Sequence, residues 1–398
     1  MNPILKQMIG PPPVHLVPGS GGDILVLSMR RVADLAAYCP QYEFEDVIAD
    51  VTGADRLEPT RLELVEFKRK VYKALYSVSP APFARYVTPK LGGLRLDKTY
   101  DLFLPIFNHI YEIFALNAVP DWRKRCRYAA CIISEAWESA LPEYLLKSLA
   151  DFDHIYLSSN PVESVARITG RPCTYLPLGI DAIGFCPFPD PPLRSIDVLG
   201  IGRRSATTHA ALLQLARDRG LFYYYDTIRT TAGIADAARQ ITFSVADSGE
   251  HRFKLASLLK RSRYYMASRA RANEENHAYV DEMSSRFFEG AASGAIMIGD
   301  PPVSGKYLSL FDWRDAVVKT PFDAPNIGNV IQELEADPER CARIRRENME
   351  NALLRHDYAY RLGTILDDAG IASPPGLVAR ESRLRELAEL VRVGPIAS

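Results

Sequence analysis

The sequence lacks the patterns that usually mark a metal site or a membrane protein. None of its six cysteines forms a C-x-x-C pair, and its seven histidines form no H-E-x-x-H motif. Because zinc sites are built from such closely spaced ligands, no structural metal site is expected, and the cysteines are interpreted as reduced. No run reaches the roughly 18 apolar residues of a transmembrane helix, and the proline-broken first residues are unlike a signal peptide.

An excess of charge of one sign is missing as well. Forty-eight Lys and Arg residues stand against 49 Asp and Glu residues, which gives a formal net charge of -1. This balance argues against an overall polyanion-binding surface, so no nucleic-acid partner is expected. We expect a cytoplasmic protein, and the sequence leaves open a peripheral contact with a membrane or with envelope assembly. The oligomeric state is not determined by the sequence.

Short apolar runs alternate with amphipathic segments along the chain. Because strands that alternate with helices form βαβ units, this pattern predicts an α/β fold with parallel sheets. The predicted strands are 23–29, 100–107, 128–134, 154–158, 173–176, 196–201, 221–225, 241–246, 263–267 and 295–298. The predicted helices are 61–77, 141–150, 161–169, 207–219, 281–292, 326–335, 339–354, 358–369 and 381–393, so the C-terminal end is expected to be helical.

A proline-rich segment divides this pattern into two halves. Residues 177–195 have no periodicity, and proline removes hydrogen bonds from both helices and strands, so this segment is interpreted as a linker. We expect a first domain at 1–176, a second at 196–370 and a final helical segment at 371–398. Because ligands of open α/β sheets bind at the carboxyl ends of the strands, a site in a cleft between the two sheets is expected.

The most informative stretch is YVDEMSSRFFEGAASGAIMIGDPP, residues 279–302. Asp281 and Glu289 are separated by seven residues, a step that returns to nearly the same face of a helix. A helix over 281–292 would present both carboxylates on one side, with Gly294 as its C-cap. The simpler alternative is a surface helix before a buried strand, in which Arg286 pairs with Glu282.

This stretch resembles the C-terminal motif of GT-B glycosyltransferases, of the group-one type and its CgeB-like relatives. That motif is an acidic residue, seven residues, Glu, small residues with Gly, and a hydrophobic strand. Three further segments match the family in the same order: LPLGIDAIGFCPFP at 176–189, SIDVLGIGRR at 195–204 and NALLRHDYAYRLGTILDDAG at 351–370. The resemblance covers residues 170–370 well, whereas the first half matches only in texture.

The resemblance implies two Rossmann-like domains that face each other across a cleft. The first would bind the acceptor and the second a nucleotide-sugar donor, and the C-terminal helix would cross back to the first domain. The implied reaction moves a sugar to an acceptor hydroxyl of a glycan, a polysaccharide precursor or a small molecule. It is expected to retain configuration and to need neither metal nor cofactor, because the nucleotide sugar is a co-substrate and no D-x-D motif lies in a suitable loop.

By the same resemblance, Glu289 would bind the ribose hydroxyls of the donor, and Asp281 would stand beside the transferred sugar. Asp281 is one methylene shorter than the Glu of the family, so Glu282 is a competing candidate. Arg286 and Gly294, which belong to the same motif, are assigned to the donor site.

Two basic features are candidates for phosphate binding. Gly202, followed by Arg203 and Arg204, lies where a predicted strand turns into a helix, and backbone N–H groups and Arg forks suit a diphosphate. The alternative is a tight turn with solvated arginines. Residues 251–271 contain seven Lys or Arg and no acidic residue. Lys260 and Arg261 of this run would face the leaving diphosphate, and a basic helix face is the alternative.

Glu135 and His109 each follow an apolar run in the first half. Glu135 would be the acceptor-side base, or else a residue at a helix start. His109 would contact the donor sugar, as a His in this part of the family often does, or else lie on a helix face. Two other functions stay open: a catalytically inactive GT-B-like binding protein of polysaccharide or envelope assembly, and a nucleotide-sugar epimerase that needs no acceptor.

Overall fold

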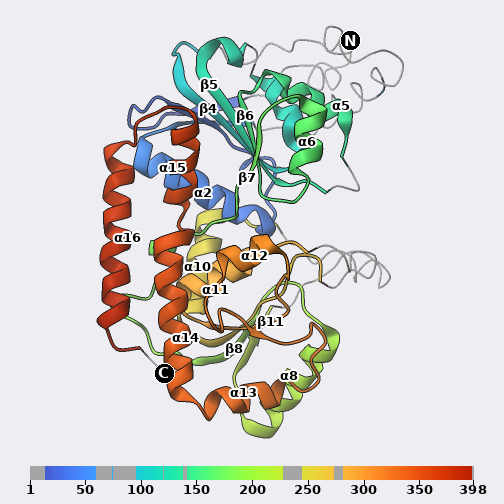
Figure 1. The fold of residues 1–398 in the computed structure, drawn as a ribbon, viewed down its shortest axis with the longest axis vertical. Helices are drawn as coiled ribbons and strands as arrows, with labels where there is room; N and C mark the ends of the chain where they lie inside the picture. The colour runs from blue at the N-terminus through green and yellow to red at the C-terminus, as the bar shows by residue number, and fades with distance from the viewer. Residues whose placement is uncertain are drawn as a thin grey trace. The chain divides into compact units, whose positions relative to one another are not determined.

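The computed structural model describes residues 14–59, 74, 96–119, 121–137, 141–226, 244–272 and 281–396. The chain divides into two compact units, and each draws on several stretches of the sequence (Figure 1). Unit 1 comprises Met1–Asp34, Phe44–Pro177 and Arg361–Val378. Unit 2 comprises Leu35–Glu43, Leu178–Tyr360 and Ala379–Ser398.

Unit 1 is built on a mostly parallel sheet. Within the described residues, its strands lie in the order β1-β3-β2-β4-β5-β6-β7, and β1 pairs antiparallel with β3. The bounds are β1 Val14–Val17, β2 Ile24–Leu27, β3 Asp55–Pro59, β4 Tyr100–His109, β5 Cys126–Glu135, β6 His154–Leu157 and β7 Cys173–Tyr175. The apolar run of β2 is buried at every position, as expected of a parallel strand covered on both faces.

Helices and 3-10 segments connect these strands, except for α15, which comes after the strands of unit 2 in the sequence. They are α2 Cys39–Thr52, η1 Ala36–Tyr38, η2 Ile110–Ala118, η3 Trp122–Arg125, α5 Glu143–Leu146, η5 Lys147–Asp151, α6 Val162–Thr169 and α15 Tyr358–Asp368. Two of them contain a unit boundary: α2 passes from unit 2 to unit 1 after Glu43, and α15 does so after Tyr360. In unit 1 the Phe152 ring stacks on Phe103 and on Trp122, and the Phe103 and Trp122 rings meet at a tilt.

Unit 2 is built on a parallel sheet in the order β12-β11-β10-β8-β9, counted over the residues that the structure describes. The strands are β8 Ile196–Gly200, β9 Tyr223–Tyr225, β10 Ser262–Met266, β11 Ile296–Gly299 and β12 Val318–Lys319. The helices are α7 Ala182–Phe185, α8 Ala206–Arg219, α10 Ser248–Lys260, α11 Ser285–Ser293, α12 Gly305–Leu310, α13 Ile327–Glu335, α14 Pro338–Asn351, the π-helix Ala352–His356, and α16 Pro375–Val393.

The strand order of each sheet indicates where a ligand would bind. In unit 1 the chain moves from β2 to β3 on one side and from β4 to β5 on the other, so the topological switch point lies between β2 and β4. In unit 2 it lies between β8 and β10. Binding crevices of open α/β sheets form at the carboxyl ends of the strands at such points. The segments after β4 and β8 are therefore the places to examine.

A buried aspartate organises the C-terminal part of unit 2. The Asp357 carboxylate accepts hydrogen bonds from the N–H groups of Ala182 and Ala359, at 2.9 and 2.8 Å. Arg380 of α16 contacts both of its oxygens at 2.8 Å. Further along, Arg392 pairs with Glu350 of α14, so the two helices run side by side (Figure 1).

The predicted fold class is confirmed: the protein is mixed α/β with parallel sheets and a helical C-terminal region. One predicted helix starts too early, because α11 begins at Ser285 and not at 281. The predicted helix at 141–150 is divided into α5 and the 3-10 segment η5. The predicted helix at 61–77 lies outside the described residues except for Ala74, and so do residues 241–243 of a predicted strand, of which Ser244 forms an isolated bridge with Leu35.

Candidate functional site

The loop after β8 forms an anion site. Gly202 adopts a φ of 78°, and its N–H points at Asp226, the residue that follows β9. The N–H lies 3.1 Å from each oxygen of the Asp226 carboxylate. The loop then reaches Ser205, the N-cap of α8, whose hydroxyl accepts from the N–H of Thr208 at 3.1 Å. A backbone N–H just before a helix start, in a glycine turn, is suited to hold negative charge.

Arginine side chains complete this site. The Arg204 guanidinium donates to Asp226 Oδ1 at 3.0 Å and to the Asp226 main-chain oxygen at 2.6 Å, and it lies over the Tyr225 ring. Arg286 of α11 donates to the Ile201 carbonyl at 3.3 Å. The φ of 78° favours glycine at this position, and a Cβ atom there would lie 2.5 Å from an Arg286 nitrogen, so the Arg286 side chain would have to shift. We refer to Gly202 N–H and Arg204, flanked by Arg286, as the anion site.

The structure therefore brings together three predicted donor-site residues, Gly202, Arg204 and Arg286. Arg203 lies in the same loop and is partly buried. Sequence reasoning missed Asp226, the anion that this site now holds. A signal was present, since an acidic residue directly follows the strand YYY beside the glycine loop.

Asp281 and Glu289 do not share a helix face. Asp281 precedes α11 in an irregular segment, and its carboxylate accepts from the N–H of Val303 at 2.9 and 3.2 Å. The predicted side-by-side arrangement of the two carboxylates is thus wrong. The physical reason is that Ser284 has extended backbone dihedrals and acts as the N-cap, so the helical periodicity begins only after it. The competing candidate Glu282 is buried.

Glu289 lies inside a buried ionic network of unit 2 and is only 3% exposed. Its Oε1 contacts Arg252 Nη1 at 2.5 Å, and its Oε2 accepts from the Tyr265 hydroxyl at 3.3 Å. Arg252 also forms two bonds with Glu43, at 3.0 and 3.1 Å. Burial raises the pKa of Glu43 to about 7, although Arg252 acts in the opposite direction. Both oxygens of Glu289 are therefore engaged within the protein.

Gly294 has the predicted role of a helix C-cap, with a φ of 67° after α11. A Cβ atom there would lie 2.7 Å from the sulfur of Met349 and 3.0 Å from Arg194. Arg194 is buried and donates to the carbonyls of Ser262, the first residue of β10, and of Ser293, the last residue of α11. Gly294 thus permits close packing behind the sheet, and the structure does not bring it to the anion site.

Lys260 and Arg261 lie at the other end of the sheet. They form the junction of α10 and β10, where the main-chain oxygen of Arg261 accepts from Ile196 at the amino end of β8. Because β8 and β10 are parallel, the anion site is at the opposite, carboxyl end. The position of these residues does not support contact with a leaving diphosphate. The basic run 251–271 is divided between α10, β10 and a loop, and its Arg252 is buried in the ionic network.

His109 and Glu135 are neighbours in unit 1. They end β4 and β5 and face each other in the parallel register at the carboxyl edge of the sheet. His109 Nδ1 accepts from the N–H of Tyr111 at 3.2 Å, so the proton of the neutral ring is on Nε2. Nε2 lies 3.7 Å from Oε1 of Glu112.

Two buried glutamates near this edge were missed by sequence reasoning. Glu112 accepts from the backbone and side-chain nitrogens of Asn108 at 2.7 to 3.2 Å, and burial raises its pKa to about 7. Glu45 of α2 accepts from the Ser28 hydroxyl at 2.6 Å, after β2, and burial raises its pKa to about 7 as well. Two buried carboxyl groups with raised pKa values thus lie near the switch point of unit 1.

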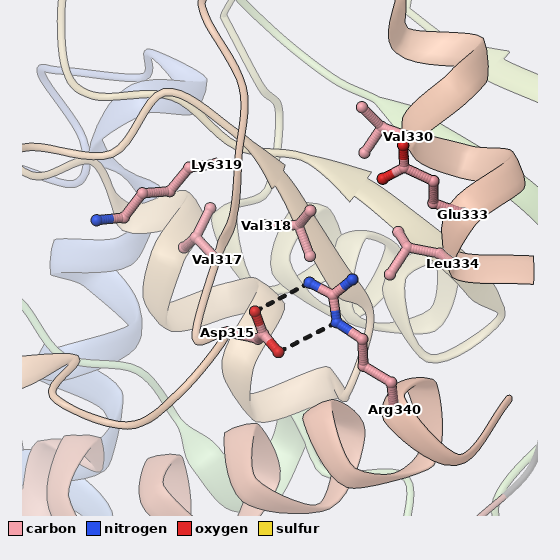
Figure 2. Close-up of a pocket in the computed structure, with 8 residues that line it drawn as sticks. All are labelled: Asp315, Val317, Val318, Lys319, Val330, Glu333, Leu334 and Arg340. Carbon is pink, nitrogen blue, oxygen red and sulfur yellow. Dashed lines mark hydrogen bonds and ion pairs between the residues drawn. The ribbon is translucent and has the colours of Figure 1, made fainter. Parts of the chain in front are cut away.

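A separate cavity of about 390 Å³ lies in unit 2 between β12, α13 and α14 (Figure 2). Its rim carries the ion pair of Arg340 with Asp315, at 3.0 and 3.1 Å. None of the predicted site residues lines it.

All six cysteines are free thiols. Across the described ranges, no group of three or more His, Cys, Asp or Glu side chains is arranged to hold a metal ion. The same residues contain no helix that is both long and apolar enough to cross a membrane.

Residues 232–367 match a protein family described as glycosyl transferase-like. This stretch contains α10, α11 and Arg286, and over it the chain is similar to that family. The predicted resemblance to glycosyltransferases is confirmed at this level, and the finer placement in the group-one or CgeB-like type stays a prediction. No curated protein matches the sequence.

Solved structures that are similar to this chain include the crystal structure of TarM. It has 10% sequence identity and a TM-score of 0.43, and the match covers 67% of this chain and 54% of the TarM chain. A variant of S. aureus TarM in complex with fondaparinux, alpha-GlcNAc-glycerol and UDP has 8% identity and a TM-score of 0.43, over 67% and 55%. The wall teichoic acid polymerase TagF has 8% identity and a TM-score of 0.35, over 93% and 89%. The matched region spans about half the length of the two TarM chains.

Proposed function

We propose that this protein is a glycosyltransferase that moves a sugar from a nucleotide-sugar donor to an acceptor hydroxyl. Unit 2 would bind the donor diphosphate at Gly202, Arg204 and Arg286. One observation carries the proposal: an N–H before a helix and an Arg fork already hold a carboxylate at the switch point of unit 2. The glycosyl transferase-like match to residues 232–367 supports the same ligand class.

The reaction forms a bond between the acceptor oxygen and the anomeric carbon of the sugar and breaks the bond to the phosphate oxygen. The negative charge that develops on the leaving diphosphate would be stabilised by Arg204, Arg286 and the Gly202 N–H. These groups supply the positive potential, so the proposed reaction needs no metal. We further propose that configuration is retained, with Asp281 beside the transferred sugar.

The acceptor would bind to unit 1, and its hydroxyl must lose a proton. His109 and Glu135 lie together at the carboxyl edge, with Glu112 behind His109. The pKa of Glu112 is raised to about 7 by burial and by the charge of Glu135, so the two carboxyl groups interact at this edge. We propose Glu135 as the base that contacts the acceptor, and His109 as a contact to the donor sugar.

The experiment that tests the donor site is a calorimetric titration with UDP, GDP, ADP and CDP. At least one should bind, and Arg204→Gln should lower its affinity by roughly tenfold or more, because charge-assisted hydrogen bonds contribute about 1.5–3 kcal/mol. Arg392→Gln, which removes an exposed Arg of α16, is the matched control. Binding of none of the four nucleotides would refute the donor site.

A second function, a binding protein without transferase activity, is favoured by one observation. Both oxygens of Glu289 are engaged by Arg252 and Tyr265, and the side chain is buried, so it presents no free oxygen to a ribose. Incubation with the nucleotide sugar of the base that binds separates the two functions. Release of the nucleoside diphosphate, by transfer or by slow hydrolysis, would establish an enzyme.

A further inference from the structure

The Asp226 carboxylate occupies the donors that a phosphate group would use. The single hydrogen of the Gly202 N–H is shared between its two oxygens, and Arg204 donates to Oδ1. The side chains of Arg204 and Asp226 are 23% and 18% exposed, so water can reach the pair and a ligand can as well. A phosphate oxygen cannot accept from the Gly202 N–H, or from the Arg204 N–H that faces Oδ1, while the carboxylate is in place.

Arg204 does not depend on Asp226 alone for its position. Its guanidinium lies 5.3 Å from the centre of the Tyr225 ring, an interaction that persists when the carboxylate leaves. The Gly202 N–H is fixed by the turn before α8, and Arg286 remains beside it. Displacing Asp226 would therefore expose a prearranged set of donors with net positive charge.

We propose that Asp226 is an internal competitor of phosphate at the anion site, which weakens the binding of every ligand whose phosphate uses Gly202 and Arg204. The proposal rests on the proposed function for the class of ligand. Asp226 lowers the affinity for the donor and for the nucleoside diphosphate that remains after transfer, and its return to the site assists release of that product. Ligands without phosphate, such as nucleosides, are not affected.

The test compares the binding of inorganic pyrophosphate, UDP and uridine to wild-type protein, Asp226→Ala and Asp226→Asn. We expect Asp226→Ala to bind pyrophosphate about tenfold more tightly than wild type, which corresponds to about 1.4 kcal/mol. The same gain is expected for UDP if uracil is the base that binds, and none for uridine. Asp226→Asn keeps the shape and removes the charge, so it gives a result even where alanine perturbs folding.

Asp300→Asn is the matched control. Asp300 follows β11 at the same edge and pairs with Arg269 at 3.3 Å, so this variant removes an equal charge without touching the anion site. It should change pyrophosphate affinity by less than about twofold, because the Asp300 charge is paired with Arg269 and water reaches that pair. In the double variant Asp226→Ala/Arg204→Gln the gain should disappear.

Three outcomes separate this inference from the proposed function. If wild type binds and both Asp226 variants bind more tightly, the competitor role is supported. If wild type binds and the Asp226 variants bind equally or more weakly, Asp226 instead orients Arg204 or contacts the ligand, and only the inference falls. If neither wild type nor any Asp226 variant binds pyrophosphate or a nucleoside diphosphate, the donor site falls as well.

Discussion

The two units place opposite kinds of groups at equivalent points of their sheets. In unit 2 the segment after β8 presents donors: the Gly202 N–H and the arginines 204 and 286. In unit 1 the end of β4 carries His109, and the segment after it carries the buried carboxylate acceptor Glu112. One edge thus carries arginines and a backbone N–H, and at the other burial raises the pKa of Glu112. The same fold class supports both, because loops at the carboxyl ends vary independently of the strands.

Helix α2 contributes one buried glutamate to each unit, and the two are paired differently. Its Glu43 belongs to unit 2 and pairs with Arg252, whereas its Glu45 belongs to unit 1 and accepts from the Ser28 hydroxyl. Burial raises the pKa of each to about 7. Glu43 shares a guanidinium with Glu289, while Glu45 lies 3.7 Å from Arg30, which is partly exposed. The two glutamates therefore differ mainly in how their charge is paired.

The largest expected effect comes from breaking the pairing in unit 2. Arg252→Met leaves Glu43 and Glu289 buried without their cation. Removing one partner of a buried ion pair generally lowers stability by about 3–5 kcal/mol. Urea unfolding at pH 7.5 measures this change in the free energy of unfolding.

The matched variant in unit 1 is Arg30→Met. Arg30 pairs with Asp46 at 2.6 Å, but it is partly exposed, and Glu45 keeps its bond from Ser28. We expect a loss of about 1 kcal/mol. Equal losses in the two variants would show that the buried ionic network of unit 2 contributes no more to the free energy of unfolding than the partly exposed pair of unit 1.

The pH dependence of stability tests the buried glutamate of unit 1, Glu45. The pKa of Glu45 is about 7 in the folded protein, above the usual 4.5. Between these values the folded protein binds more protons than the unfolded chain, so this group makes stability fall as the pH rises from about 4.5 to 7. Glu45→Gln should remove a part of that slope, on the order of 3 kcal/mol over the window. Thermal unfolding at pH 5 and pH 8 measures it.

The control for this titration is Glu386→Gln, which removes an exposed carboxylate of α16. Its unfolding curve should follow wild type at both pH values. A Glu45→Gln variant with the wild-type slope would mean that Glu45 stays charged in the folded protein at neutral pH, held by Arg30 and Arg56.

Sequence patterns were sufficient where local periodicity and local chemistry agree. The apolar run of β2 predicts that strand of unit 1. The alternation around β8 and α8 predicts the elements that carry the anion site, and the glycine turn predicts Gly202 and Arg204. Strand β3, with the sequence DRLEP, was missed because its charges are unusual for a strand. In the folded chain Arg56 and Glu58 pair with each other at 2.6 Å, which only the tertiary structure reveals.

Long-range partners were the part that the sequence could not supply. Nothing near Glu289 in the sequence indicates that Arg252 and Glu43 would surround it, since they are 37 and 246 residues away. The position of Lys260 and Arg261 also depends on strand direction, which places them at the amino end of the sheet. Charge runs show what is near in sequence, whereas a site requires what is near in space.

The smallest expected effect concerns the residue that caps the helical segment after β8 and after β4. In unit 2 the cap is Ser205, a residue separate from the anion donors, and Ser205→Ala should lower stability by about 1 kcal/mol. Pyrophosphate affinity should change by less than about twofold, because Gly202 and Arg204 precede the helix.

In unit 1 the cap is His109 itself, whose Nδ1 accepts from Tyr111 only while unprotonated. His109→Ala should therefore remove the cap and the site residue together. A large loss of pyrophosphate binding in Ser205→Ala would show that in unit 2, too, the capping residue belongs to the site.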